Sequence, residues 1–432
     1  MNGRTCDIRT DVAVVGAGSS GSAAALQCAR RGMEVICIDR RKLERAGARW
    51  ANNIPGWTFE AAGVARPTPP ELVGEEVPLH MFAGFGPRRI VIENAGLLEV
   101  DMRRLVGRLQ SSAEAAGARF MGEVSVGEFD GEVLETSKGS IGARWFVDAA
   151  GLGGAGLIDT PTPERSDICT AAQQAHRITD AAAARRFFAD RDVPYGHILC
   201  YAGTHGSYSV IFVRPHGDDQ INILTGSIPA NGNSSGRQIL AEFVDANSDW
   251  IGAEIFGGSS PIPLGPPARR LARGRVAVIG DAALQVLSAH GSGVGAGLVA
   301  ANMLAKSLAE GAGAAEYARR WQRRYGALFA AYEMFRRFSV ELSADELAKM
   351  MEHGLLHPEL ASLSLRQTVP IPDRLLFLNP LVLFRAPRLT LKLGSAAVDM
   401  VRAALLYRSY PDEAHRIPQW SKKARRLFDD AE

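Results

Sequence analysis

The chain has 432 residues and a formal net charge of +2, since 49 lysines and arginines nearly balance 47 aspartates and glutamates. Hydrophobic residues make up 46% and charged residues 22%, which excludes a disordered chain, a coiled coil and a collagen-like fibre. At roughly 150 residues per domain, the length predicts two or three domains. The near-zero net charge argues against a dedicated nucleic-acid-binding protein.

The cysteines and histidines predict neither a disulfide framework nor a metal site. Five cysteines are scattered along the chain without a C-x-x-C pair. His353 and His357 are four residues apart on a predicted helix, but a third ligand is missing. The polar first ten residues and the lack of about 18 consecutive apolar residues predict no signal peptide and no membrane-spanning helix. A reducing, cytoplasmic location fits these features.

Residues 11–39 carry a dinucleotide-binding pattern. A buried parallel strand is predicted over Asp11–Val15, a helix over Ser22–Arg31 and a second strand over Glu34–Ile38. Three glycines with the spacing G-x-G-x-x-G separate the first strand from the helix, and Asp39 closes the second strand. This order of strand, glycine turn, helix, strand and acid is typical of a Rossmann-like nucleotide site.

Each residue type in this pattern has a physical reason. Gly16 permits the tight turn, Gly18 lets backbone approach a pyrophosphate, and Gly21 lets the helix pack on the strand. The helix start offers free N–H groups and a positive dipole end to phosphates. Asp39 is placed to accept hydrogen bonds from a ribose. Arg40 follows it, either as a solvated strand end or near the adenosine phosphate.

A second glycine-rich motif lies far along the chain. A buried strand predicted over Arg275–Ile279 leads into Gly280 and Asp281. Nine residues after Asp281, the segment His290–Gly297 contains four glycines, and an apolar helix is predicted to continue through Ala305. The alternative interpretation is an ordinary helix start with structural glycines.

With both motifs in view, the chain resembles the FAD-binding proteins of the p-hydroxybenzoate hydroxylase fold. The resemblance implies that Asp281 holds the ribityl chain of FAD. It also implies that N–H groups around Gly293 and Val294 meet the pyrimidine edge of the flavin. A helix start suits this place, because it stabilises the negative charge of a reduced flavin. Non-covalent FAD is therefore the predicted cofactor.

The resemblance also predicts the domain organisation. The fold class is α/β: a Rossmann-like FAD-binding domain of glutathione reductase type 2, an inserted mixed β-sheet for the substrate, and a helical C-terminal region. The implied boundaries are 1–159 with 261–312 for the discontinuous FAD-binding domain, 160–260 for the substrate-binding domain, and 313–432 for the helical region.

Three weaker features support this resemblance. Arg144–Gly151 resembles the strand that returns under the cofactor, and Gly47–Trp50 resembles the loop that crosses the flavin. Leu98–Ala118 is a predicted helix, on which the family often has an arginine toward FAD; here Met102 takes that place and Arg103 follows. The predicted FAD-binding residues are Gly16, Gly18, Ser19, Ser20, Gly21, Asp39, Arg40, Arg49, Arg103, Val124, Ala150, Gly280, Asp281, Gly291, Gly293 and Val294.

The middle of the chain is predicted to hold the substrate. Tyr208–Arg214 and Gln220–Gly226 have strand composition and flank a turn cluster at 216–219, which predicts a β-hairpin. The hairpin resembles the substrate-side strands of geranylgeranyl reductases, although the tryptophan of their pattern and their Cys-Gly-Gly flavin loop are absent. The predicted substrate-contacting residues are His205, Tyr208 and Phe212.

These features predict an FAD-dependent oxidoreductase that reduces or oxidises a C=C bond of a largely apolar small molecule, as geranylgeranyl reductase-like proteins do. The alternatives are a flavin-dependent monooxygenase and a non-redox FAD-dependent cyclase. Ala149-Ala150-Gly151 lacks the acid that many aromatic hydroxylases carry there, which disfavours hydroxylation. Only one complete dinucleotide fingerprint occurs, so electrons are expected from transiently bound NAD(P)H, a separate donor protein or the substrate.

His290 is the candidate catalytic residue, because it stands just before the flavin-facing glycines and an unperturbed imidazole titrates near neutrality. The alternative is a loop histidine bonded to backbone.

The C-terminal region has a different character. Glu316–Leu342 is a predicted amphipathic helix, and Leu375–Arg408 mixes apolar runs with basic residues. This segment is either an interfacial surface for peripheral membrane contact or a lid over an apolar substrate, or else a helical cap with solvated arginines.

Overall fold

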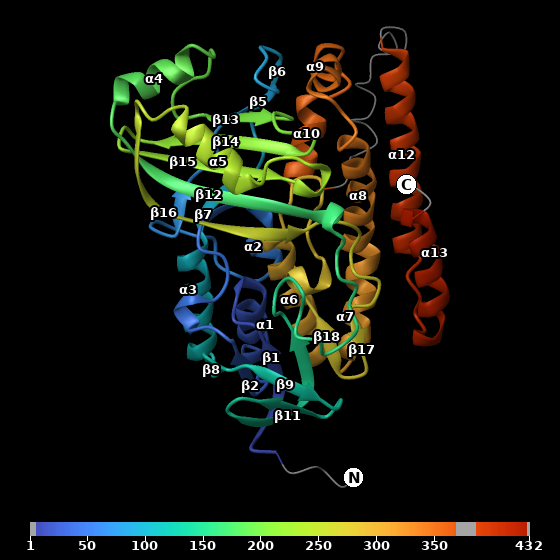
Figure 1. The fold of residues 1–432 in the computed structure, drawn as a ribbon. Coiled ribbons are helices and arrows are strands. Elements are labelled where there is room, and N and C mark those ends of the chain that lie inside the picture. The colour runs from blue at the N-terminus through green and yellow to red at the C-terminus, as the bar shows by residue number, and fades with distance from the viewer. Residues whose placement is uncertain (1–5, 369–385, 430–432) are drawn as a thin grey trace.

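The computed structural model describes residues 6–368 and 386–429. Figure 1 shows an α/β body at the bottom, a second sheet across the top, and long helices along one side. The mixed architecture is an α/β fold with two main sheets, as the sequence predicts. The part of Leu375–Arg408 before residue 386 lies outside the described residues.

The lower sheet has the strand order β17-β18-β11-β1-β2-β8, with β10 and β9 added beside β11. Its central strand β1 is parallel to both neighbours and buries Val12–Val15 completely or nearly so, which explains its run of β-branched residues. The strands are β1 Ile8–Val15, β2 Val35–Ile38, β8 Arg119–Met121, β9 Val126–Phe129, β10 Val133–Thr136, β11 Gly139–Asp148, β17 Ala272–Arg273 and β18 Val276–Val278.

Helices α1 and α6 pack closely against each other beside this sheet, and α3 packs against α1. The alanine-rich sequence of α1 permits the close approach, since small side chains bring helix axes together. At the crossing, a Cβ atom on Gly297 would lie 2.1 Å from the hydroxyl of Ser20. The helices are α1 Ser19–Ala29, α2 Trp57–Ala61, α3 Met102–Ala115 and α6 Val294–Ala309, the last preceded by a 3-10 turn at Gly280–Ala283.

The upper sheet has the order β16-β12-β15-β14-β13-β5-β6. The predicted hairpin is confirmed, because β14 and β15 pair in antiparallel register from Ser209↔Ser227 to His216↔Gln220. Helices α4 and α5 cover one face of the sheet with apolar side chains. The elements are β5 Leu79–Ala83, β6 Arg89–Ile92, β12 Ile168–Ile178, α4 Ala181–Ala189, β13 Ile198–Ala202, β14 Ser209–His216, β15 Gln220–Ser227, α5 Gly236–Asp245 and β16 Ile251–Pro263.

A three-stranded sheet, β3-β7-β4, joins the two halves. Its strands are β3 Ala51–Pro55, β7 Leu97–Asp101 and β4 Leu72–Gly74. The predicted helix over Leu98–Ala118 is therefore wrong at its start, because Leu98–Asp101 pairs with β3 and the Asp101 side chain caps α3. Short 3-10 turns occupy Leu43–Arg45, Arg165–Asp167 and Pro229–Asn231.

The sequence-based domain boundaries stay a prediction, but strand pairing adds to them. Strands β5 and β6 come from the N-terminal third of the chain and extend the upper sheet at β13. The substrate-side sheet therefore uses residues from outside 160–260.

The C-terminal region is helical, and the predicted helix over 316–342 is confirmed in outline. It is formed by α7 and α8 with a π-helical segment at Gln322–Gly326 between them. His353 ends α9 and His357 caps α10, so the expectation that they share one helix is wrong. None of the described helices is both long and apolar enough to cross a bilayer. The helices are α7 Gly313–Trp321, α8 Ala327–Ser339, α9 Ala344–Glu352, α10 Pro358–Leu365, α12 Pro387–Arg408 and α13 Ile417–Asp429, with a 3-10 turn at Ala414–Arg416.

We expect Gly297→Ala to lower the free energy of unfolding by roughly 1–3 kcal/mol, because the added methyl group overpacks the crossing of α1 and α6. Urea denaturation of the purified protein measures the change. Gly107→Ala is the matched control: Gly107 also lies within a helix, a Cβ added there would meet no atom within 4 Å, and the variant should gain up to about 1 kcal/mol. Equal stability of Gly297→Ala and wild type would contradict the packing argument.

Candidate functional site

The first glycine loop is shaped by close backbone contacts. Gly16 has φ +102°, and a Cβ there would lie 2.3 Å from the carbonyl oxygen of Ala149. A Cβ on Gly21 would lie 1.7 Å from the carbonyl oxygen of Gly16. At Gly18, by contrast, the nearest neighbour of a Cβ is Gly47 Cα at 3.4 Å, an ordinary contact. Protein packing thus requires Gly16 and Gly21, whereas Gly18 leaves bare backbone for a ligand.

Asp39 lies at the end of β2, beside this loop. Its Oδ2 accepts a hydrogen bond from the backbone N–H of Ala17 at 2.8 Å, and its Oδ1 accepts one from Arg41 at 2.8 Å. The buried residue Val124 donates its N–H to the Asp39 carbonyl at 2.9 Å. The structure thereby brings together Asp39, the predicted ribose contact, and Val124, another of the predicted FAD-binding residues. Arg40 is exposed beside them.

The second motif meets the first across Ser20. Cβ atoms added to Gly280 and Gly297 would lie 2.6 and 2.1 Å from the Ser20 hydroxyl, so both glycines admit α1. Asp281 Oδ1 lies 3.3 Å from the Cβ position of Gly293, where α6 begins. The N-termini of α1 and α6 carry no side-chain cap, and Ser20 in the first turn of α1 lies against Gly297 in the first turn of α6. Two positive dipole ends therefore converge there.

Asp281 is the charged group of this junction. Its carboxylate makes no hydrogen bond to any described residue, and enclosure by the fold raises the pKa of Asp281 above its ordinary value. An enclosed carboxylate without a donor is costly unless a ligand supplies one. A ribityl hydroxyl of FAD fits that requirement.

The remaining predicted contacts surround the junction unevenly. Ala150 lies against Gly16, with its Cα 2.9 Å from where a Cβ of Gly16 would stand. Arg49 is exposed and donates to the Glu44 carbonyl at 2.8 Å. Arg103 is held by Asp101 through two hydrogen bonds of 3.0 and 2.7 Å, and its guanidinium lies 4.1 Å from the ring centre of Phe256. Arg103 therefore already has protein partners.

FAD fits this set of residues. Gly18, Ser19 and Ser20 would hold the pyrophosphate at the start of α1, and Asp39 would hold the adenosine ribose. Asp281 would hold the ribityl chain, and the N–H groups at the start of α6 would face the flavin. The assignment of each residue to FAD stays a prediction.

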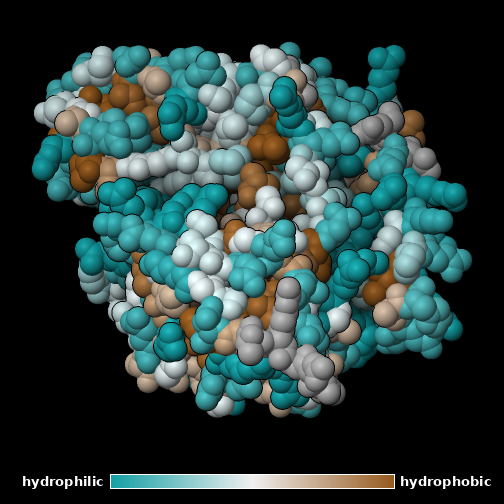
Figure 2. Space-filling view, turned by 60° about the horizontal axis from the view of Figure 1, so that its bottom comes forward, coloured by the Kyte–Doolittle hydropathy of each residue, from teal (hydrophilic) through white to brown (hydrophobic). Residues whose placement is uncertain are grey.

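The inner face of the upper sheet lies opposite the second glycine loop. A Cβ on Gly291 would lie 3.7 Å from Ile262 of β16 and 3.9 Å from the hydroxyl of Tyr208. At the other side, a Cβ on Gly258 would lie 2.9 Å from the Trp50 ring. Strand register puts further side chains on this same face: the apolar Ala171, Val210, Phe212 and Leu224, and the polar Gln173, Asn222 and Arg214. Figure 2 shows hydrophobic residues near the middle of one molecular face, among hydrophilic ones.

Of the three predicted substrate residues, two lie on this side. Tyr208 donates its hydroxyl to the Ser288 carbonyl at 2.7 Å, and Phe212 is partly buried on the inner face. His205 contacts Thr204 at 2.9 Å and Glu242 of α5 at 3.2 Å. His205 therefore lies beside α5, and its predicted contact with the substrate stays a prediction.

His290 is tied to the C-terminal region. Its Nε2 lies 2.9 Å from the Ser364 carbonyl of α10, so Nε2 carries the proton and donates. Burial lowers the pKa of His290, with the Ser364 carbonyl opposing that shift. Burial therefore favours the neutral ring, and the Ser364 carbonyl holds its proton on Nε2. This geometry favours loop positioning, because donating the Nε2 proton would break the bond to Ser364.

A buried polar cluster beside the site was missed by sequence reasoning. Glu99 of β7 accepts from Asn222 at 2.7 Å and pairs with Arg214 at 2.8 Å and His216 at 3.2 Å. Burial alone would raise the pKa of Glu99, but the hydrogen bond and charge of His216, with Arg214, hold it below its ordinary value. The available signal was an acid inside the apolar run Leu97–Asp101, since a buried charge requires partners.

Gln173 was also missed. It is buried on the inner face of β12, and its Oε1 has no hydrogen-bond partner within the described structure. Alternation along β12 could have placed it on the substrate side once the sheet register was known.

Comparisons with known proteins agree with this site. The model of the FAD dependent oxidoreductase family matches residues 11–61, which contain the first glycine loop and Asp39. Digeranylgeranylglycerophospholipid reductase of Methanothrix thermoacetophila is 25% identical over 405 residues, which cover 89% of this chain and 100% of the relative. Menaquinone reductase of Mycolicibacterium smegmatis is 26% identical over 332 residues, covering 72% and 79% of the two chains.

Among solved structures, a geranylgeranyl bacteriochlorophyll reductase-like protein from Thermoplasma acidophilum aligns with a TM-score of 0.67 at 16% identity. The alignment covers 90% of this chain and 99% of that one. The chain is an FAD-dependent oxidoreductase, and its fold is that of the geranylgeranyl reductase-like proteins. The predicted fold class and enzyme class are confirmed, and the family match supports FAD as the cofactor.

We expect Asp281→Ala to weaken FAD retention by roughly 10- to 150-fold, since it removes a charged acceptor worth about 1.5–3 kcal/mol. Equilibrium dialysis of FAD against the apoprotein measures the change. The apoprotein itself should not become less stable near pH 7, because the raised pKa of Asp281 means that its ionised form opposes folding. Asp190→Ala, an exposed acid at the end of α4, is the control, and equal FAD affinity in both variants would contradict the assignment.

For His290→Asn we expect weaker FAD retention and a free energy of unfolding lowered by about 0.5–1.5 kcal/mol, because the bond to Ser364 is lost. Both limbs of the pH–rate profile should remain, and His353→Asn serves as the control. Normal FAD content with a rate reduced roughly 10²–10⁴-fold and a lost limb near neutrality would instead establish proton transfer by His290.

Proposed function

We propose that this enzyme reduces C=C bonds in a largely apolar small molecule with an isoprenoid-type chain. One observation carries the proposal: the apolar inner face of the upper sheet lies directly opposite the loop that would face the flavin. The names of the two curated relatives, a digeranylgeranylglycerophospholipid reductase and a menaquinone reductase, support a prenylated lipid as the substrate class.

Bound FAD would supply the hydride for such a reduction. The protein would orient the substrate by burying its chain against Phe212, Leu224 and Ile262, at roughly 25 cal/mol for each Å² of apolar surface removed from water. Gln173 is a polar residue on this face whose Oε1 has no hydrogen-bond partner among the described residues, and this oxygen would accept a hydrogen bond from a polar group of the substrate. Trp50, packed on Gly258, would shield one side of the site from water.

The electron source and the location of the enzyme belong to the same proposal. NAD(P)H bound transiently, or a separate donor protein, would reduce the flavin, because the chain has only one complete dinucleotide fingerprint. We also propose that the enzyme is cytoplasmic and contacts the membrane peripherally through its basic C-terminal region. Apolar substrates are most concentrated in the membrane, so this contact would bring the enzyme to them.

The test is anaerobic single turnover. The FAD-loaded enzyme is reduced with dithionite and mixed with a detergent-dispersed geranylgeranyl lipid, while flavin absorbance and product mass are followed. We expect the flavin to reoxidise without oxygen and the product to gain two hydrogen atoms per double bond. The phytanyl analogue, which has no double bond, is the matched control and should leave the flavin reduced.

Each contrary outcome overturns the proposal. Reoxidation that requires oxygen and yields a hydroxylated product would identify a monooxygenase. An isomeric product formed without a change in flavin absorbance would identify a non-redox cyclase.

A further inference from the structure

Helix α12 exposes a stripe of apolar side chains. Six large hydrophobic residues are well exposed among the described residues, and four of them lie on this helix. They are Leu391, Val398, Val401 and Leu405, with exposed fractions of 77%, 51%, 59% and 59%. Their spacing of seven, three and four residues places them along one face, over about 21 Å.

This stripe is opposite the face that packs on the protein. The buried residues of α12 are Leu389, Ala396, Ala403 and Tyr407, which recur on the other side of the helix. In Figure 1, α12 lies at the outer edge of the molecule alongside α8. An outer helix normally turns polar residues to solvent, so a second apolar face indicates a binding surface.

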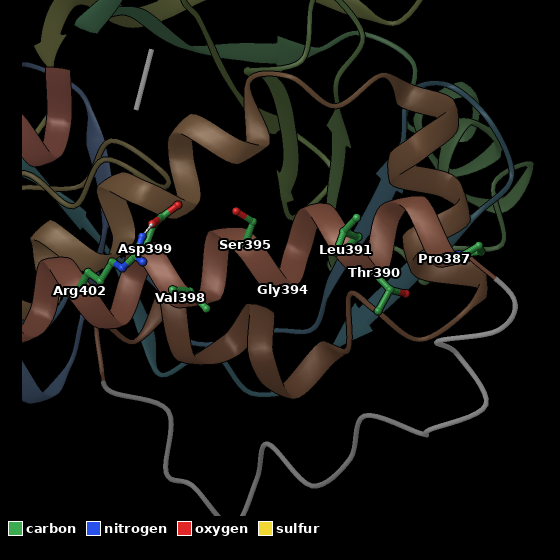
Figure 3. Close-up of a pocket in the computed structure, with 8 residues that line it drawn as sticks. All are labelled: Pro387, Thr390, Leu391, Gly394, Ser395, Val398, Asp399 and Arg402. Carbon is green, nitrogen blue, oxygen red and sulfur yellow. Dashed lines mark hydrogen bonds and ion pairs between the residues drawn. The ribbon is translucent and has the colours of Figure 1, made fainter. Parts of the chain in front are cut away.

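A shallow groove of about 550 Å³ follows the same side of α12. Figure 3 shows its described lining residues in a row along the helix, with Gly394 and Ser395 between Leu391 and Val398. Because Gly394 and Ser395 are small, the side chains of Leu391 and Val398 project beyond the helix surface between them.

The helices at the C-terminal end of the described chain carry an excess of positive charge. Residues 387–429 contain nine lysines and arginines against four aspartates and glutamates. Some of these cations are engaged, since Arg402 pairs with Asp399 at 3.1 Å and Lys392 with Glu346 at 3.5 Å. The exposed residues that form no ion pair with any described residue are Arg388 and Arg408 of α12 and Lys422, Lys423, Arg425 and Arg426 of α13.

We propose that α12 and α13 bind the surface of an anionic lipid bilayer, with Leu391, Val398, Val401 and Leu405 inserted at the headgroup level. Apolar side chains flanked by lysine and arginine suit this interface, because the apolar groups enter the acyl boundary while the cations meet lipid phosphates. The inference names the protein surface and the lipid charge of the membrane contact. It rests on the proposed function, which gives the enzyme a reason to bind a membrane.

A second copy of the chain fits this surface less well. A stable protein interface buries about 800 Å² on each partner and is depleted in lysine at its core. The apolar stripe consists of only four side chains on one helix. In a symmetric contact, the lysines and arginines that pair with no described residue would face the same residues of the second copy, and like charges would repel.

The experiment is vesicle flotation of the FAD-loaded protein. Vesicles of phosphatidylcholine with phosphatidylglycerol are compared with vesicles of phosphatidylcholine alone. We expect flotation with the anionic vesicles, lowered by added salt, and little with the neutral ones. Val398→Asn with Leu405→Asn should lower partitioning at least roughly tenfold. Arg388→Gln and Arg408→Gln should each lower it roughly fivefold, the effect of one charge near an anionic surface.

Ile255→Asn is the matched control, because Ile255 is an exposed hydrophobic residue of β16 outside this surface. It should leave flotation unchanged, and all variants should keep the wild-type unfolding temperature and flavin content. The inference is overturned if the wild type does not float with anionic vesicles, or if the α12 double variant floats as the wild type does. The inference is likewise overturned if the α12 double variant has a different oligomeric state from the wild type but floats as the wild type does, since the surface would then bind a second copy of the chain. Flotation requires no turnover, so its failure is distinguishable from failure of the proposed reduction.

Discussion

The close approach of α1 and α6 is the constraint on which the cofactor site depends. Ser20 lies where Gly280 and Gly297 carry no side chain, and Gly21 touches the backbone of Gly16. Because these glycines have no side chain, the two helices approach closely and their N-terminal ends converge on one region. Their combined dipoles and free N–H groups then create a site for an anionic cofactor. The start of α1 would hold its phosphates, and the start of α6 would face its flavin.

The upper sheet completes the site by supplying an apolar boundary. Strand alternation sends one set of side chains to α4 and α5 and the other set toward the cofactor half. Polar groups on this inner side are either paired, as in the cluster around Glu99, or placed singly, as Gln173 is. A substrate bound there would therefore be recognised mainly through its apolar surface.

The C-terminal helices contact both the cofactor loop and the substrate sheet. His290 donates to Ser364 of α10, so the flavin-side loop depends on a helix more than seventy residues later in the chain. The buried residue Arg336 of α8 pairs with Glu333 at 2.7 Å and with Asp167, just before β12, at 2.6 Å. Helix α8 in turn supports α12. Cofactor loop, substrate sheet and the proposed membrane surface thus share one supporting layer.

The sequence by itself determined the local features: the nucleotide-binding order of residues 11–39, the hairpin of β14 and β15, and the strand that leads into Gly280 and Asp281. Each depends on spacing or alternation within a short segment, where turn geometry and hydrophobic periodicity act directly. Only the tertiary structure decided that β5 and β6 join the upper sheet, that His205 lies beside α5, and that His290 has a carbonyl partner. Those outcomes depend on strand register and on contacts between distant segments, which no local pattern encodes.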